Sequence, residues 1–103
     1  MSGIYSVQQI KFEVLAYIKE FGAQFGEWYV GIADDPKQAL FEDHRVDPEN
    51  GIWLYRQAVS FAACLTIQRY FTETLGTDGI PPETGTEQTD CIYLFRKSET
   101  TVP

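Results

Sequence analysis

The chain has 103 residues, 44% of them apolar and 15% aromatic, which suits one folded domain over residues 1–103 rather than two. Its formal charge of −7, from 15 acidic against 8 basic residues, disfavours direct nucleic-acid binding, which usually requires a basic face. No run is long and apolar enough to span a bilayer, and no basic start followed by an apolar block indicates a secretory signal, so we expect a cytoplasmic protein.

The first predicted element is a helix over about residues 6–22. Ser6 and Gln9 fit a capping box, apolar residues then recur at helical spacing, and Gly22 is a suitable helix end. Phe12 falls opposite the apolar stripe. An exposed Phe is common, and a contact with a partner is the alternative.

Residues 27–32 are rich in aromatic and branched side chains, which predicts a strand. A short helix should follow, because Asp34 or Asp35 can cap it and Pro36 fits its first position. We expect this helix to end near His44.

The second half of the chain predicts two strands and a helix between turn signals and loops. In chain order these segments are a turn at 47–51, a strand over 52–57, a helix over 60–75, a loop over 77–89, a strand over 90–97 and a flexible tail over 98–103. The loop is longer than most connections, which favours a function or mobility for it.

The predicted order is therefore helix, strand, helix, strand, helix, strand. An α+β fold with a small three-stranded sheet and three helices would bury all the apolar faces. The second and third strands alternate in character, which favours a sheet that is at least partly antiparallel, with the strand order left open.

Acidic residues gather at 34–49 and 78–90, whereas Lys and Arg are scattered. A solvated, soluble surface explains this pattern most simply, and a surface that meets a basic protein partner is the alternative. Cys64 and Cys91 are interpreted as small buried hydrophobes. A single histidine cannot complete a zinc site, so we expect no metal and no cofactor.

The stretch Tyr29–Gly31, followed by Asp35–Leu40 and His44, resembles the second half of the signature of GIY-YIG nucleases, over about residues 28–75. The resemblance implies a phosphodiester-cleaving site built from a tyrosine, an arginine, a metal-binding glutamate and often a histidine. Arginine and metal would neutralise the charge that builds on the phosphate.

Carried over residue by residue, the resemblance leaves Tyr29 and His44 as the catalytic candidates. The arginine position falls beside Ala39, and the glutamate position falls near Gln68. Since an amide cannot replace a carboxylate as a charged metal ligand, we expect a domain without metal-dependent catalysis.

Each candidate also has a structural interpretation. Gln68 can be a core glutamine bonded to a backbone group, His44 can cap a helix end, and Gly31 can mark a bulge or close packing. The residues considered for binding are Gly31, Gln68, Asp34, Asp35, Glu42 and Asp43.

Three functional hypotheses follow. The first is a small, acidic, non-catalytic protein-binding domain, for example a phage-type inhibitor or DNA mimic that meets a basic partner. The second is a GIY-YIG-like nuclease with a rearranged site that uses Tyr29 and His44. The third is a small-ligand sensor with residues 77–89 as a lid.

Overall fold

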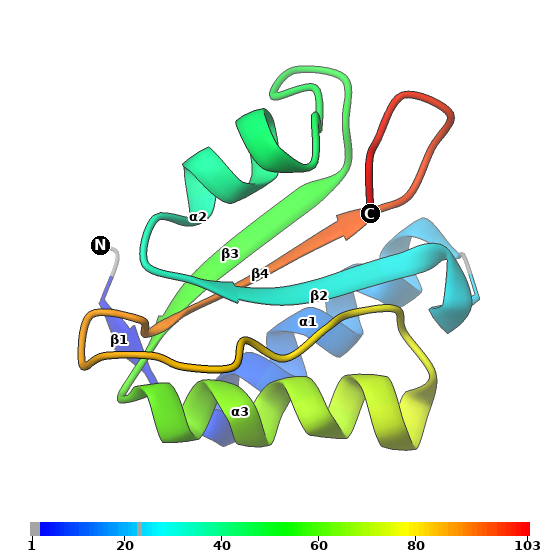
Figure 1. Ribbon diagram of the computed structural model, residues 1–103. Helices are drawn as coiled ribbons and strands as arrows, with labels where there is room; N and C mark the ends of the chain where they lie inside the picture. Colours follow the sequence, from blue (N-terminus) through cyan, green and yellow to red (C-terminus); the bar gives the residue numbers. More distant parts are fainter. Residues whose placement is uncertain (1–2, 23) are drawn as a thin grey trace.

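In the computed structural model, which describes residues 3–22 and 24–103, the first helix, α1, spans Val7–Phe21 (Figure 1). The Ser6 hydroxyl accepts a hydrogen bond from the Gln9 amide, and the Gln9 side chain accepts one from the Ser6 amide, so the predicted capping box is confirmed. Gly22 ends the helix with φ of 67°, a left-handed conformation that glycine adopts without strain.

The sheet has four strands in the order β1-β3-β4-β2. The strands are β1 (Ile4–Tyr5), β2 (Trp28–Ala33), β3 (Trp53–Ala58) and β4 (Cys91–Arg96). Strand β4 is antiparallel to both β2 and β3, which confirms the α+β fold and the partly antiparallel sheet. The expected number of three strands was wrong, because β1 has two residues, too few to show a pattern, and pairs in parallel with β3.

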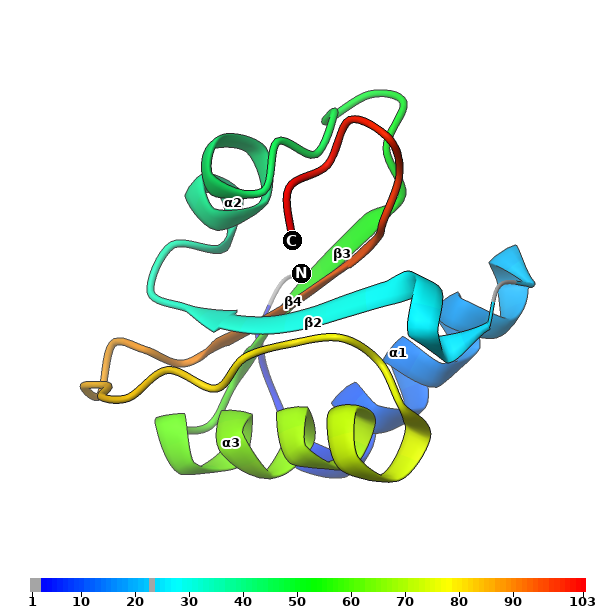
Figure 2. The ribbon, with the colours of Figure 1, turned by 45° about the vertical axis from the view of Figure 1, so that its right-hand side comes forward.

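Side chains alternate along the strands, so the two faces of the sheet pack differently (Figure 2). One face packs on α1 and on α3 (Phe61–Arg69), and its buried strand residues include Trp28, Val30, Ile92 and Leu94. The other face lies under α2 (Pro36–Gln38), and its buried strand residues are Tyr29, Tyr93 and Phe95.

Two helices end in wider π-helical turns. Helix α2 spans Pro36–Gln38 and continues as a π-turn over Ala39–Asp43. Helix α3 spans Phe61–Arg69 and continues over Tyr70–Leu75 before Gly76. A single 3₁₀ turn, Phe25–Glu27, leads into β2.

The loop after α3 begins by covering the outer edge of β2 (Figures 1 and 2). The Asp78 amide donates to the Trp28 carbonyl at 2.8 Å, and the Val30 amide donates to the Asp78 carbonyl at 3.0 Å. This part of the predicted loop therefore completes the hydrogen bonding of an edge strand.

Residues 98–103, for which the sequence predicted a flexible tail, fold back beside the end of α2. The Val102 amide donates to the His44 carbonyl at 2.7 Å, and the Val102 carbonyl lies 2.7 Å from His44 Nδ1. The segment is thus bonded to His44, which directly follows the turn that ends helix α2.

Within the part of the chain that the structure describes, no helix has the length and apolar character needed to cross a membrane.

Candidate functional site

Tyr29 and His44, the two catalytic candidates, lie together on the α2 face of the sheet. Their ring centroids are 4.6 Å apart, and Tyr93 of β4 completes a cluster with them. We call Tyr29, His44 and Tyr93 the Tyr–His cluster. Tyr93 was not among the sequence candidates, because it lies 49 residues along the chain from His44 and only the sheet brings them together.

Both ring nitrogens of His44 have hydrogen-bond partners. Nδ1 lies 2.7 Å from the Val102 carbonyl, and Nε2 lies 2.7 Å from the Tyr93 hydroxyl. A carbonyl only accepts, so Nδ1 carries the proton, and in the neutral ring Nε2 accepts from the Tyr93 hydroxyl. His44 therefore joins the C-terminal segment to the sheet.

Burial raises the pKa of both tyrosines of the cluster. For Tyr93, the nearby Tyr29 and Asp43 add to the effect. For Tyr29, the charge of Asp78 acts in the same direction, while the Ile80 backbone opposes it. Both phenols are therefore protonated at neutral pH.

Gly31 lies directly beneath the Tyr93 ring. A Cβ at position 31 would overlap Cζ, Oη and Cε1 of that ring. The interpretation of Gly31 as a site of close packing is confirmed, and the tight neighbour is the aromatic ring that bonds to His44.

Gln68 is buried, and its side chain forms hydrogen bonds at the edge of β2, away from the Tyr–His cluster. Its amide nitrogen donates to the Val30 carbonyl at 3.0 Å and to the Ile80 carbonyl at 3.3 Å. The interpretation of a core glutamine bonded to the backbone is confirmed. Gln68 joins α3, the edge of β2 and the segment after α3, and it does not meet Tyr29 or His44.

The candidate acids Asp34, Asp35, Glu42 and Asp43 are exposed. Asp35 caps α2, because its side chain accepts from the Gln38 amide at 3.1 Å. Burial, and then the charge of Asp90, raise the pKa of Cys91 to about 11, with Asp34 and Asp35 adding to the shift. The two acidic regions of the sequence thus approach each other around a protonated thiol.

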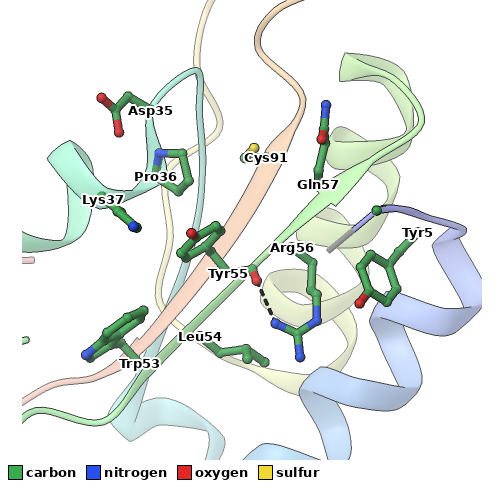
Figure 3. A pocket seen from close by; sticks show the side chains of 11 residues that line it. Tyr5, Asp35, Pro36, Lys37, Trp53, Leu54, Tyr55, Arg56, Gln57 and Cys91 are labelled. Carbon is green, nitrogen blue, oxygen red and sulfur yellow. Dashed lines mark hydrogen bonds between the residues drawn. The ribbon is translucent and has the colours of Figure 1, made fainter. Parts of the chain in front are cut away.

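A cavity of about 470 Å³ lies between the start of α2 and strands β3 and β4 (Figure 3). We call it the edge pocket. Its lining includes the side chains of Tyr5, Asp35, Lys37, Trp53, Tyr55 and Cys91. The rings of Trp53 and Tyr55 are stacked at 6.2 Å with planes 5° apart, and Trp53 also packs edge-on against Phe41.

Half of the main-chain groups of β3 face away from the rest of the sheet. The Arg96 amide donates to the Ile52 carbonyl and the Ala58 amide to the Asp90 carbonyl, so the even-numbered residues between them bond to β4. The main-chain groups of Trp53 and Tyr55 therefore point outward. Within residues 3–22 and 24–103, strand β1 pairs with Gln57 and Ala58, and no described segment pairs with Trp53 or Tyr55.

Two side chains already cover carbonyls on this outer edge. The Tyr17 hydroxyl donates to the Trp53 carbonyl at 2.8 Å, and Arg56 Nη1 donates to the Tyr55 carbonyl at 2.7 Å (Figure 3). Arg56 also pairs with Glu13 at 2.7 Å. The outward amides of Trp53 and Tyr55 are thus the donors that this edge presents beyond the end of β1.

A second hollow, of about 330 Å³, lies beside the same edge on the α1 side. We call it the helix hollow. It is lined by Phe12, Glu13, Ala16, Tyr17 and Glu20, together with Leu54 and Arg56, which also line the edge pocket. Phe12, for which the sequence left a partner contact open, is 73% exposed there.

No protein family, curated protein or solved structure matches this chain. Within residues 3–22 and 24–103, no three His, Cys, Asp or Glu side chains are grouped as ligands for a metal ion. In the Tyr–His cluster, both ring nitrogens of His44 already have partners, whereas the edge of β3 offers main-chain donors between two hollows.

Proposed function

We propose that this protein is a non-catalytic binding domain that captures an extended segment of a partner protein along the outer edge of β3. The observation that carries the proposal is the outer edge of β3 at Trp53 and Tyr55, where no described residue pairs with the outward amides, between the edge pocket and the helix hollow. An added strand would accept hydrogen bonds from the outward amides, and its alternating side chains would enter the two hollows in turn.

The proposed resemblance to GIY-YIG nucleases is compatible with this function. The resemblance would align the family's arginine at or beside Ala39 and its glutamate near Gln68, and the lack of both groups supports a binding role in place of catalysis. Gln68 is bonded to the Val30 and Ile80 carbonyls, which gives the amide a structural role.

The test is selection of displayed extended peptides against the pure domain, with the bound peptide mapped by amide chemical shifts. We expect the largest shifts at Trp53 and Tyr55. The Tyr55→Pro variant should bind more weakly than Tyr55→Ala, because both lack the ring but only the proline lacks the outward N–H. The ladder to β4 does not use that N–H.

Two results would contradict the proposal. One is shifts in the wild-type protein that centre away from β3, for example on the Tyr–His cluster. The other is equal peptide affinity of Tyr55→Pro and Tyr55→Ala with both variants folded. The amide chemical shifts of the wild-type protein test the proposal even if the proline variant unfolds.

The proximity of Tyr29 and His44 supports a second candidate, a phosphodiester enzyme with a rearranged site. Incubation of the pure protein with plasmid DNA and Mg²⁺ or Mn²⁺ tests this directly. Cleavage that is lost in Tyr29→Phe would favour the enzyme over the binding domain. With both phenols held protonated, we expect no cleavage.

A further inference from the structure

We propose that the segment bound along β3 is basic, and that one of its Lys or Arg side chains enters the edge pocket over the rings of Trp53 and Tyr55. This inference rests on the proposed function and names the chemistry of its partner.

Negative charge surrounds the open edge on both sides. Asp35 lines the edge pocket, and Asp34 and Asp90 lie close enough to act on Cys91 in the pocket wall. Glu13 and Glu20 line the helix hollow on the other side. A bound strand would therefore place its alternating side chains between two groups of carboxylates.

The aromatic wall of the edge pocket suits a cation with an aliphatic stem. Trp53 and Tyr55 stand two residues apart on one face of β3, with nearly parallel rings. The methylene groups of Lys or Arg pack on such rings while the charged end is attracted to the ring face or reaches a carboxylate. A carboxylate side chain has no comparable interaction with the ring faces.

Two cations oppose this inference. Arg56 lines both hollows, but its guanidinium is bonded to Glu13 and to the Tyr55 carbonyl, which offsets its charge. Lys37 extends from α2 toward the pocket and would attract an acidic segment instead (Figure 3). With the Glu13–Arg56 pair counted as neutral, Lys37 is the remaining base, and four acids still line the two hollows or act on the pocket wall: Asp34, Asp35, Asp90 and Glu20.

The experiment compares three short extended peptides that alternate Val with Lys, with Gln or with Glu, each labelled for fluorescence anisotropy. We expect the Lys peptide to bind roughly tenfold more tightly than the Glu peptide. The Gln peptide should lie between them. The preference for Lys should shrink as salt rises, because exposed charges are screened.

Matched variants locate the preference in the edge pocket. Asp34→Asn with Asp35→Asn removes two charges and retains a capping side chain for α2, since Asn caps as well as Asp. This double variant should weaken the Lys peptide several-fold and leave the Gln peptide unchanged. Lys37→Gln should strengthen the Lys peptide.

The outcomes separate this inference from the proposed function. Equal binding of all three peptides at the β3 edge would overturn the basic partner but would leave the proposed binding function intact. Tighter binding of the Glu peptide would also overturn the basic partner, and it would indicate an acidic one. No binding by any peptide overturns both. Self-association that Tyr55→Pro abolishes would identify a second copy of this chain as the occupant and overturn the basic segment.

Discussion

At the scale of single residues, the packing of Gly31 against Tyr93 explains why a glycine interrupts an otherwise bulky strand. The Tyr93 ring occupies the space that a side chain at position 31 would fill, and its hydroxyl bonds to His44. The glycine therefore positions the ring that connects β4 to the end of α2.

Replacing Gly31 by alanine should lower the free energy of unfolding by roughly 1–3 kcal/mol, because Tyr93 must leave its position. Urea unfolding measures the change. Gly26→Ala is the matched control: a Cβ there has only the Gly76 carbonyl nearby, at 4.0 Å, so it should change stability by about 0.5 kcal/mol or less. If Gly31→Ala matches Gly26→Ala, the close packing has no energetic consequence.

The sequence identified several of these residues but not their partners. Gly31 and His44 stand out by residue type, and the core role of Gln68 follows from its place on an apolar helix face. Tyr93 does not stand out, because alternating aromatics are ordinary in a strand. Its hydrogen bond to His44 depends on the sheet pairing and on the turn of the chain after α2.

At the scale of elements, the two outer edges of the main sheet differ in how they are covered. The edge of β2 is covered by Asp78 and by the Gln68 side chain. On the edge of β3, Tyr17 and Arg56 cover the carbonyls of Trp53 and Tyr55. Among the described residues, β1 pairs there with Gln57 and Ala58 and leaves the outward amides of Trp53 and Tyr55 without a strand partner. Because an open edge can pair with another chain, the β3 edge is the better candidate for binding.

Gln68→Met keeps most of the side-chain volume but removes the donor that joins α3 to β2. It should cost roughly 1–3 kcal/mol of stability, since the Val30 carbonyl would be buried without its side-chain partner. Hydrogen exchange at the Val30 amide, which bonds to Asp78, should accelerate as this cover loosens.

The same measurement contains its controls. The Tyr29 amide faces β4, as the Lys97-to-Glu27 bond in the same ladder shows, and should stay protected. Gln88→Met, at an exposed position, should leave both amides unchanged. Unaltered exchange at Val30 in Gln68→Met would mean that the glutamine does not hold the cover in place.

The helices and the three longer strands were predictable because their signals are local. Caps, a proline at a first helical position and alternating side chains act within a few residues. Strand β1 was not predictable, since two residues carry no period, and the order of the strands depends on contacts between distant segments. The edge pocket was missed for the same reason.

At the scale of the whole molecule, burial of thiols and phenols makes the free energy of unfolding depend on pH in the alkaline range. Burial raises the pKa of Cys64 to about 12 and of Cys91 to about 11, and it raises the pKa of Tyr17, Tyr29 and Tyr93 as well. The unfolded chain therefore loses these protons first as pH rises. The free energy of unfolding is not reduced by these groups below about pH 8.5, the ordinary pKa of a thiol. It falls as the pH rises from there toward the pKa values of the groups in the folded protein.

We expect the free energy of unfolding to decrease steadily between about pH 9 and about pH 11, as followed by urea titrations. Cys64→Ala should show a shallower decline, because one of the shifted groups is gone, even though its stability at neutral pH is somewhat lower. A decline of the same slope in both proteins would show that the Cys64 thiol does not contribute.

The position of β4 in the sheet has a consequence for how the protein is made. This strand is central, pairing with both β2 and β3, yet it is the last of the four along the chain. Until a ribosome has added residues 91–96, strands β2 and β3 lack their common neighbour and expose apolar faces. Most of the sheet must therefore form after the bulk of the chain has been synthesised, and during that interval the nascent chain is a natural client for chaperones.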